Sequence, residues 1–169
     1  GLDKSMVDME VKWNMSDEIK RHSTIEEIKE RIRTGLEILL AQGCTLTSSF
    51  IDAYSAVGHK AIDAAIEVKN QYKDKINLLT ITQPLDGLAT TEAANLYEAI
   101  TAKADIVGGL PSKDRKQSNG VQKHYDVLFS VAKNQHKPIH VHIDQENNPT
   151  ERDTEELIRQ TKKYGYEGR

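Results

Sequence analysis

The sequence predicts an α/β fold with a parallel sheet, in which short strands alternate with helices. Four short runs rich in β-branched and aliphatic residues are bounded by turn residues, a pattern typical of strands. These runs are residues 44–50, 76–82, 105–110 and 138–144. Their starts are spaced by 29 to 33 residues, which is the size of one strand-helix unit. Regular alternation of this kind favours a parallel sheet.

Helices are predicted around these runs because apolar residues recur there at helical spacing. The first helix covers residues 25–39: Ser23 and Glu26 have the spacing of a capping box before it, and Gly43 follows it as a stop signal. The acidic turn 153–156 suits the start of the last helix, because carboxylates favour the helix dipole. The remaining apolar faces lie at residues 62–69, 96–100, 125–132 and 157–161. The first 22 residues show no readable pattern.

Composition limits the possible partners. The chain has 169 residues and a formal charge of −3, which predicts one soluble domain over residues 1–169 and gives no electrostatic basis for binding nucleic acid or an anionic membrane. No apolar run is long enough to span a membrane, and the polar N-terminus does not have the pattern of a signal peptide. A single cysteine, Cys44, excludes an internal disulfide framework. A cytoplasmic protein that binds a small molecule is the expectation.

The form of the sheet is left open by the strand count. Four strands in 169 residues correspond to about half of a (β/α)8 barrel of ~250 residues, while an open doubly wound sheet also suits the length. No glycine fingerprint for phosphate binding follows any of the strands, and Gly108-Gly109 within a strand indicates close packing or a bulge. The polar segment 112–120 is interpreted as a solvated loop, with substrate binding as the alternative.

The strongest chemical signal is the run Pro138-Ile-His-Val-His-Ile-Asp144. Alternation along a strand would place His140, His142 and Asp144 on one face, at the end where α/β proteins keep their sites. Imidazole and carboxylate are ligands of zinc or iron, but one strand does not supply the geometry of a whole site. Structural histidines held by hydrogen bonds are the alternative interpretation.

The same run resembles the cytosine-deaminase-like branch of the amidohydrolase superfamily. The resemblance is carried by segments in the family's order, and it extends over almost the whole chain. These segments are Leu2-Asp-Lys-Ser-Met6, Ser49-Phe-Ile-Asp52, Gln83-Pro-Leu-Asp-Gly87, Ala104-Asp-Ile-Val-Gly-Gly-Leu-Pro111, His140-Val-His-Ile-Asp-Gln145, Arg152-Asp-Thr-Glu-Glu-Leu157 and Tyr164-Gly-Tyr-Glu-Gly-Arg169. It implies a partial (β/α)8 barrel of TIM type with four parallel strands, the central part of a barrel that lacks the first and last strands.

The resemblance also implies a chemistry. Members of this family use one divalent ion, zinc or iron, to activate water against a C–N bond of a cyclic amide, an amidine or a nitrogen heterocycle. His142 matches the family's fifth-strand ligand, and His140 is the second candidate ligand. Asp144, Gln145 and Glu146 are the catalytic candidates, although Gln145 stands where the family has a proton-transferring glutamate, and glutamine does not transfer protons as a carboxylate does.

Substrate contacts are expected on two further strands. Leu85 occupies the position of the family's substrate-binding glutamine, so the nearby Gln83 and the strand-end residue Asp52 are the candidates. The expected function is that of a fragment of a metal-dependent amidohydrolase, inactive as the isolated chain and with exposed sheet edges that favour a homo-oligomer. The alternative is an α/β module that binds a small molecule without catalysis.

Overall fold

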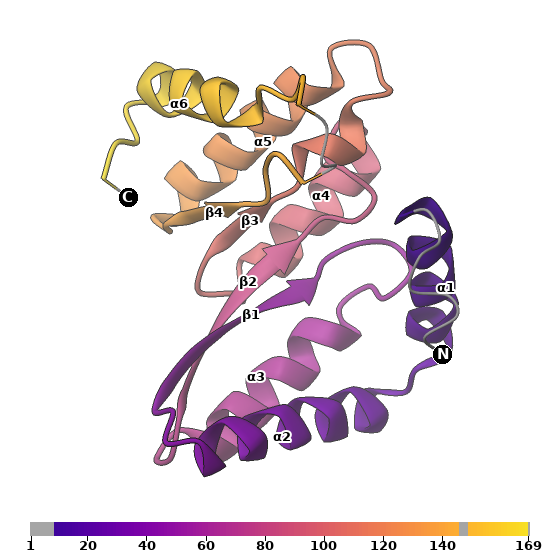
Figure 1. Ribbon diagram of the computed structural model, residues 1–169, viewed down its shortest axis with the longest axis vertical. Coiled ribbons are helices and arrows are strands. Elements are labelled where there is room, and N and C mark those ends of the chain that lie inside the picture. Colours follow the sequence, from indigo (N-terminus) through magenta and orange to yellow (C-terminus); the bar gives the residue numbers. More distant parts are fainter. Residues whose placement is uncertain (1–8, 146–148, 169) are drawn as a thin grey trace.

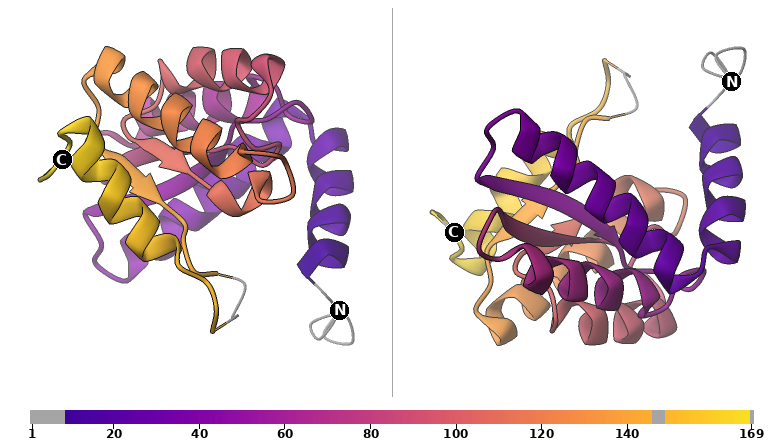
Figure 2. Two further views of the ribbon diagram at one scale, coloured as in Figure 1. Left: turned by 90° about the horizontal axis from the view of Figure 1, so that it is seen from above. Right: turned by 90° about the horizontal axis from the view of Figure 1, so that it is seen from below.

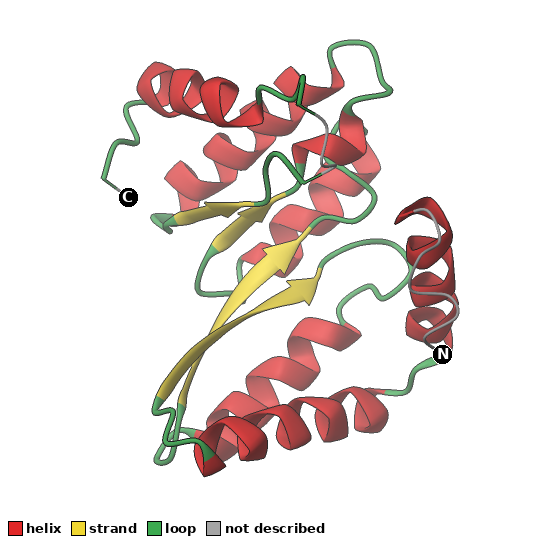
Figure 3. Cartoon of the chain, viewed as in Figure 1, coloured by secondary structure: helices red, strands yellow, loops and turns green. Residues whose placement is uncertain are grey.

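The computed structural model describes residues 9–145 and 149–168, in which helices and short strands alternate along the chain. The order is α1 (Met9–His22), α2 (Ile25–Ala41), β1 (Leu46–Asp52), α3 (Lys60–Tyr72), β2 (Asn77–Gln83), α4 (Thr91–Thr101), β3 (Val107–Gly109), the 3-10 helix η2 (Pro111–Asp114), α5 (Gly120–Gln135), β4 (Ile139–Val141) and α6 (Asp153–Tyr164). The predicted α/β alternation is therefore confirmed (Figures 1 and 3).

All pairing among the described strands is parallel. β1 pairs with β2 from Leu46↔Asn77 to Asp52↔Gln83, and β3 pairs with β4 over three residues. The isolated bridge Ile81↔Ile106 joins the two ladders, so the strands form one curved row (Figure 1). This row corresponds to part of a barrel, and the described residues do not form a closed one.

Helices pack on one face of this row, and the main core lies between them and the strands. Ile51 of β1 contributes to this core, as do Tyr97 of α4, Val107 of β3 and Leu128 of α5. A second cluster fills the space between α2, α3 and the start of β2; its buried residues are Leu36, Val68, Ile76 and Leu78. The opposite face of the strands is thereby left to carry the candidate site.

Side chains hold the junction between β2 and β3 closely together. A Cβ atom on Gly108 would lie 1.6 Å from the Thr82 carbonyl oxygen, so only glycine fits there. The Gly108 N–H donates to Thr82 Oγ1 at 3.1 Å, and the buried Tyr97 hydroxyl donates to the Gly108 carbonyl at 2.6 Å. Close packing at Gly108 is therefore confirmed.

Four local predictions need correction. The first 22 residues contain α1, whose last turn is basic and so suits the helix dipole. The capping box before α2 consists of Thr24 and Glu27, because Thr24 is the extended N-cap residue. The last strand ends at Val141, well short of Asp144. The polar segment after β3 begins with η2, in which Ser112 and Asp114 are buried, so it is not a fully solvated loop.

Two further features concern membrane crossing and self-association. None of the helices in the described part of the chain has the length and apolar character needed to cross a membrane. Within residues 9–145 and 149–168 the outer edge of β1 has no partner strand. The expected self-association stays a prediction.

Asp105 ties the turn before β3 to β2 and α3. Its carboxylate accepts hydrogen bonds from Lys69 Nζ at 2.6 and 2.7 Å, from Thr80 N at 2.7 Å and from Thr80 Oγ1 at 2.8 Å. Burial by itself would raise the pKa of Asp105. The hydrogen bonds from Lys69 and Thr80, together with the charge of Lys69, outweigh this effect and lower the pKa.

This lowered pKa predicts how stability changes in acid. A carboxyl group with a lowered pKa in the folded state stabilises the fold above its unfolded pKa of about 3.9, and this contribution is lost as the pH falls through the folded value. We expect Asp105→Asn to cost about 1–3 kcal/mol at neutral pH and to flatten the loss of stability in acid. Urea unfolding across the acid range measures both effects. Asp74→Asn, in the exposed turn after α3, is the control, and an unchanged acid dependence in Asp105→Asn would contradict the prediction.

Candidate functional site

The carboxyl ends of the parallel strands bring three of the sequence-predicted residues together. Asp52 ends β1, Gln83 ends β2 directly beside it in the ladder, and His142 follows β4. Gln83 Nε2 lies 3.4 Å from His142 Nδ1, a long contact that joins the two ladders. We call the surface formed by Phe50, Asp52, Gln83 and His142 the strand-end site.

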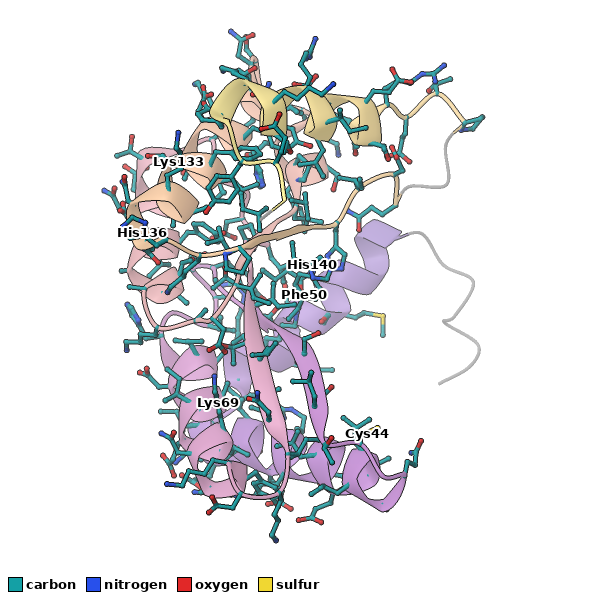
Figure 4. All side chains as sticks on the ribbon, turned by 90° about the vertical axis from the view of Figure 1, so that its left-hand side faces the viewer. Cys44, Phe50, Lys69, Lys133, His136 and His140 are labelled. Carbon is teal, nitrogen blue, oxygen red and sulfur yellow. The ribbon has the colours of Figure 1, made fainter. Side chains whose placement is uncertain are left out.

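Alternation along β4 separates the histidines from the core, as predicted. Ile139 and Val141 pack against the main core, while His140 and His142 turn to the opposite face. There the Phe50 ring stacks on His142 with centroids 4.1 Å apart, and it meets His140 edge-on at 4.9 Å. Figure 4 shows Phe50 and His140 side by side at this face. Phe50 thus fixes the orientation of His142, a role that the sequence did not suggest.

His142 is held as a neutral imidazole. Burial lowers the pKa of His142, and the neighbouring charge of His140 acts in the same direction. A metal ligand must be unprotonated on the nitrogen that binds, so a lowered pKa favours metal binding at neutral pH. The Gln83 amide N–H faces Nδ1 and can only donate, so in this geometry Nδ1 is the acceptor and the proton of the neutral imidazole lies on Nε2.

Helix α1 brings a cation to the strand-end site. Lys20 Nζ lies 3.0 Å from Asp52 Oδ2, and Tyr54 donates a hydrogen bond to Asp17 Oδ1 at 2.7 Å, so two contacts dock the helix beside the end of β1 (Figure 2). Burial raises the pKa of Asp52 although Lys20 acts in the opposite direction. Lys20 was missed by the sequence analysis; the run of acidic and then basic residues along 17–22 is the signal that could have revealed its helix.

Two cavities adjoin this site. One of about 130 Å³ lies between α1 and the loops after β2 and β3; its lining is Ser16, Asp17, Lys20, Gln83, Leu85 and Lys113. The other, of about 320 Å³, lies between α1, α2 and β1, and Lys20, Phe50 and Asp52 contribute to it. The smaller cavity has the more polar lining and contains a predicted substrate contact, Gln83.

Asp144 lies away from the strand face on which it was predicted. Its backbone has a φ of 48°, and its carboxylate turns to the start of α6, where it accepts hydrogen bonds from the backbone N–H groups of Asp153 at 3.0 Å and Thr154 at 3.3 Å. The Thr154 hydroxyl also donates to it, and this bond is the main cause of the lowered pKa of Asp144. A left-handed backbone and a helix-capping carboxylate explain why the strand does not continue.

Of the other two catalytic candidates, the structure describes only Gln145. Gln145 Nε2 donates to Ser112 Oγ at 2.6 Å, which ties the segment after β4 to η2. Glu146 lies outside the described residues. The catalytic roles of Asp144, Gln145 and Glu146 stay predictions.

The donor set decides whether a metal ion fits the site. His140 and His142 have ring centroids 6.4 Å apart. In the described part of the chain, no group of three or more His, Cys, Asp or Glu side chains is placed to hold an ion. A catalytic zinc usually has about three protein ligands. The described residues therefore do not fit a complete metal centre by themselves.

Comparison with known proteins gives three informative matches. A 5-methylcytosine deaminase from Klebsiella pneumoniae, whose structure holds 5-fluorocytosine, superimposes with a TM-score of 0.78 and 25% identity over 87% of this chain and 36% of its own. The N-isopropylammelide isopropyl amidohydrolase of a Pseudomonas strain is 26% identical over 151 residues. The resemblance to the amidohydrolase superfamily is confirmed. No family model matches this amidohydrolase-like chain.

The matched share of each relative is limited. An uncharacterized protein of Haemophilus influenzae is 33% identical over 161 residues, which are 95% of this chain and 58% of that protein. The Pseudomonas amidohydrolase is covered over 37% of its length. The amidohydrolase-like chain thus spans between about a third and three fifths of these three relatives.

Proposed function

We propose that this chain is part of a hydrolase that acts on a C–N bond of a cyclic amide, a cyclic amidine or a nitrogen heterocycle. The observation that carries the proposal is the strand-end site, where the His142 imidazole is oriented by Phe50 and meets Gln83 across the sheet. The likeness to a 5-methylcytosine deaminase and to an N-isopropylammelide isopropyl amidohydrolase supports it.

Gln83 and Asp52 are proposed to bind the ring. An amide offers both a donor and an acceptor, which suits the alternating N–H and C=O groups of a heterocycle, and a carboxylate accepts from a ring N–H. Asp52 and Gln83 are direct neighbours at the ends of β1 and β2, so one planar ligand can meet both. Lys20 beside Asp52 supplies a positive charge for a ring oxygen.

His142 and His140 are the proposed ligands of one divalent ion, zinc or iron. Such an ion supplies hydroxide at neutral pH when bound. The described residues bring together two imidazoles and no third His, Cys, Asp or Glu ligand for it. Among the catalytic candidates, Asp144 is engaged at the start of α6 and Gln145 lacks an exchangeable acid proton, so Glu146 is the remaining proton-transfer candidate.

A second candidate function is binding without catalysis. Gln145 stands where the family resemblance places an acid, and its amide is already used in a bond to Ser112. A site with this amide can bind a heterocycle through Gln83 and Asp52 and release it unchanged. Turnover of a bound ring distinguishes the two functions.

Metal content tests the proposed hydrolase. In the longer hydrolase of which we propose this chain to be part, we expect elemental analysis of untagged, metal-exchanged protein to find about one zinc or iron per chain, lost in His142→Ala because a ligand is removed. The same samples are assayed for ammonia or amine release from cytosine and related cyclic amidines. Hydrolysis that disappears with the ion supports the proposed function.

His136→Asn is the matched control. His136 is an exposed residue with a φ of 54° at the end of α5, and asparagine tolerates this left-handed backbone. The control is expected to keep the metal content of the natural chain. Ring binding without metal or turnover would favour the second function, and turnover that survives in His142→Ala would overturn the site assignment.

A further inference from the structure

A buried acid–imidazole pair lies beneath the loops that follow β2 and β3. Asp114, the last residue of η2, and His124 of α5 are both fully buried, and His124 Nδ1 lies 2.8 Å from Asp114 Oδ2. His124 Nε2 accepts a hydrogen bond from the Leu110 N–H at 3.0 Å. Because a backbone N–H can only donate, Nε2 carries no proton and Nδ1 donates to Asp114. Burial lowers the pKa of His124, which keeps this neutral form.

The Asp114 carboxylate also binds the loop after β2. It accepts hydrogen bonds from the backbone N–H groups of Leu88 at 2.6 Å and Ala89 at 3.2 Å, in addition to the side chain of Gln117 at 3.2 Å. A buried carboxylate is costly unless donors surround it, and here four donors do. The pair therefore joins residues 84–90 to η2 and α5.

Both joined segments border the strand-end site through the 130 Å³ cavity that adjoins it. Gln83 precedes the first loop, and Leu85 within it lines the 130 Å³ cavity together with Lys113 of η2. Ser112 of η2 accepts the hydrogen bond from Gln145. A shift of either loop would therefore move the cavity wall and the anchor of Gln145.

We propose that Asp114 and His124 are positioning residues of the strand-end site. They fix the loop after β2 against η2, so that the cavity wall and Gln145 meet a ligand in one geometry. Being fully buried, neither touches the ligand. The inference rests on the proposed binding of a nitrogen heterocycle at this site.

Two variants of His124 separate positioning from bulk packing. His124→Leu removes the donor and the acceptor, whereas His124→Gln retains one of each. We expect the leucine variant to bind 5-fluorocytosine about 10–100-fold more weakly, as for other supporting residues that orient a site, and the glutamine variant to recover most of the loss. Binding is followed by NMR titration of the full 169-residue chain.

A second readout makes the test independent of ligand binding. The side-chain amide signal of Gln145 and the backbone amide signal of Leu85 are expected to shift in His124→Leu and to stay near their natural positions in His124→Gln. If the natural chain binds no 5-fluorocytosine, the proposed function loses its support, while these signals still test the positioning role.

The result that overturns the inference is a folded His124→Leu chain with unchanged Gln145 and Leu85 signals. If that variant does not fold, Asp114→Asn takes its place, because it keeps the volume and weakens the acceptor. Unchanged signals in a folded Asp114→Asn chain would overturn the inference equally. Shifted signals with weakened binding support it.

Discussion

Gly108→Ala is expected to abolish cooperative folding of the chain. The added methyl group would lie 1.6 Å from the Thr82 carbonyl oxygen and 2.7 Å from its carbonyl carbon, which are backbone atoms of the neighbouring strand. Relief requires β2 and β3 to move apart, which would break the bonds that Gly108 makes with Thr82 and Tyr97. We expect a loss of at least about 4 kcal/mol, a large share of the stability of an ordinary domain. Urea unfolding followed by circular dichroism measures it.

Two other glycines provide controls for this substitution. A methyl group on Gly109 would meet only side chains, those of Leu128 and Val141 at 3.0 to 3.2 Å, so we expect a cost of about 1–3 kcal/mol. Gly35 lies within α2 with nothing within 4 Å of the added atom, so Gly35→Ala is expected to stabilise by about 0.5–1 kcal/mol. A Gly108→Ala chain as stable as Gly109→Ala would contradict the close approach.

Gly87→Ala is expected to cost about 3–5 kcal/mol, for two separate reasons. Gly87 has a φ of 77°, which costs an alanine about 1–2 kcal/mol. The added methyl group would also lie 2.3 Å from Asp114 Oδ1. That carboxylate is held by hydrogen bonds from His124 and from the Leu88 N–H. Moving it away from the added methyl group would therefore break buried hydrogen bonds.

Gly43→Ala measures the cost of a positive φ without a clash, and so allows the clash at Gly87 to be separated from it. Gly43 has a φ of 81° after α2, and an added methyl group meets nothing within 4 Å. The difference between the two free energies of unfolding therefore reports the clash with Asp114 alone. Equal losses of unfolding free energy in Gly87→Ala and Gly43→Ala would show that the Asp114 carboxylate can move aside without loss of stability, which would contradict the prediction.

The sequence predicted the elements better than their ends. Periodicity found α2, because this helix buries one face against its neighbours and so leaves a repeat in the sequence. β1 was found from a run of β-branched and aliphatic residues bounded by turn residues. The capping box was placed one residue early, since Ser23 and Thr24 both have a glutamate three residues later and only the backbone of Thr24 is that of an N-cap. β4 was predicted too long because the Asp144 carboxylate accepts a hydrogen bond from the first residue of α6, nine residues later, and the strand ends before it.

Those parts of the candidate site that follow from local sequence patterns were predicted. Alternation placed His140 and His142 on one face, and the strand ends brought Asp52 beside Gln83. The residues that support these groups were not predicted, because their contacts join distant parts of the chain. His124 did leave a trace, since it lies four residues before Leu128 on the apolar stripe of its helix, where an imidazole needs a partner.

The junction between the two ladders has a mechanical consequence. Its backbone pairing is limited to the bridge Ile81↔Ile106, but the close approach at Gly108 holds the two strands firmly together. The two ladders therefore form one stiff unit, and Gln83 and His142, which lie on opposite sides of the junction, face each other in one arrangement. A ligand that contacts both meets a site that is already ordered, so little conformational entropy is lost on binding.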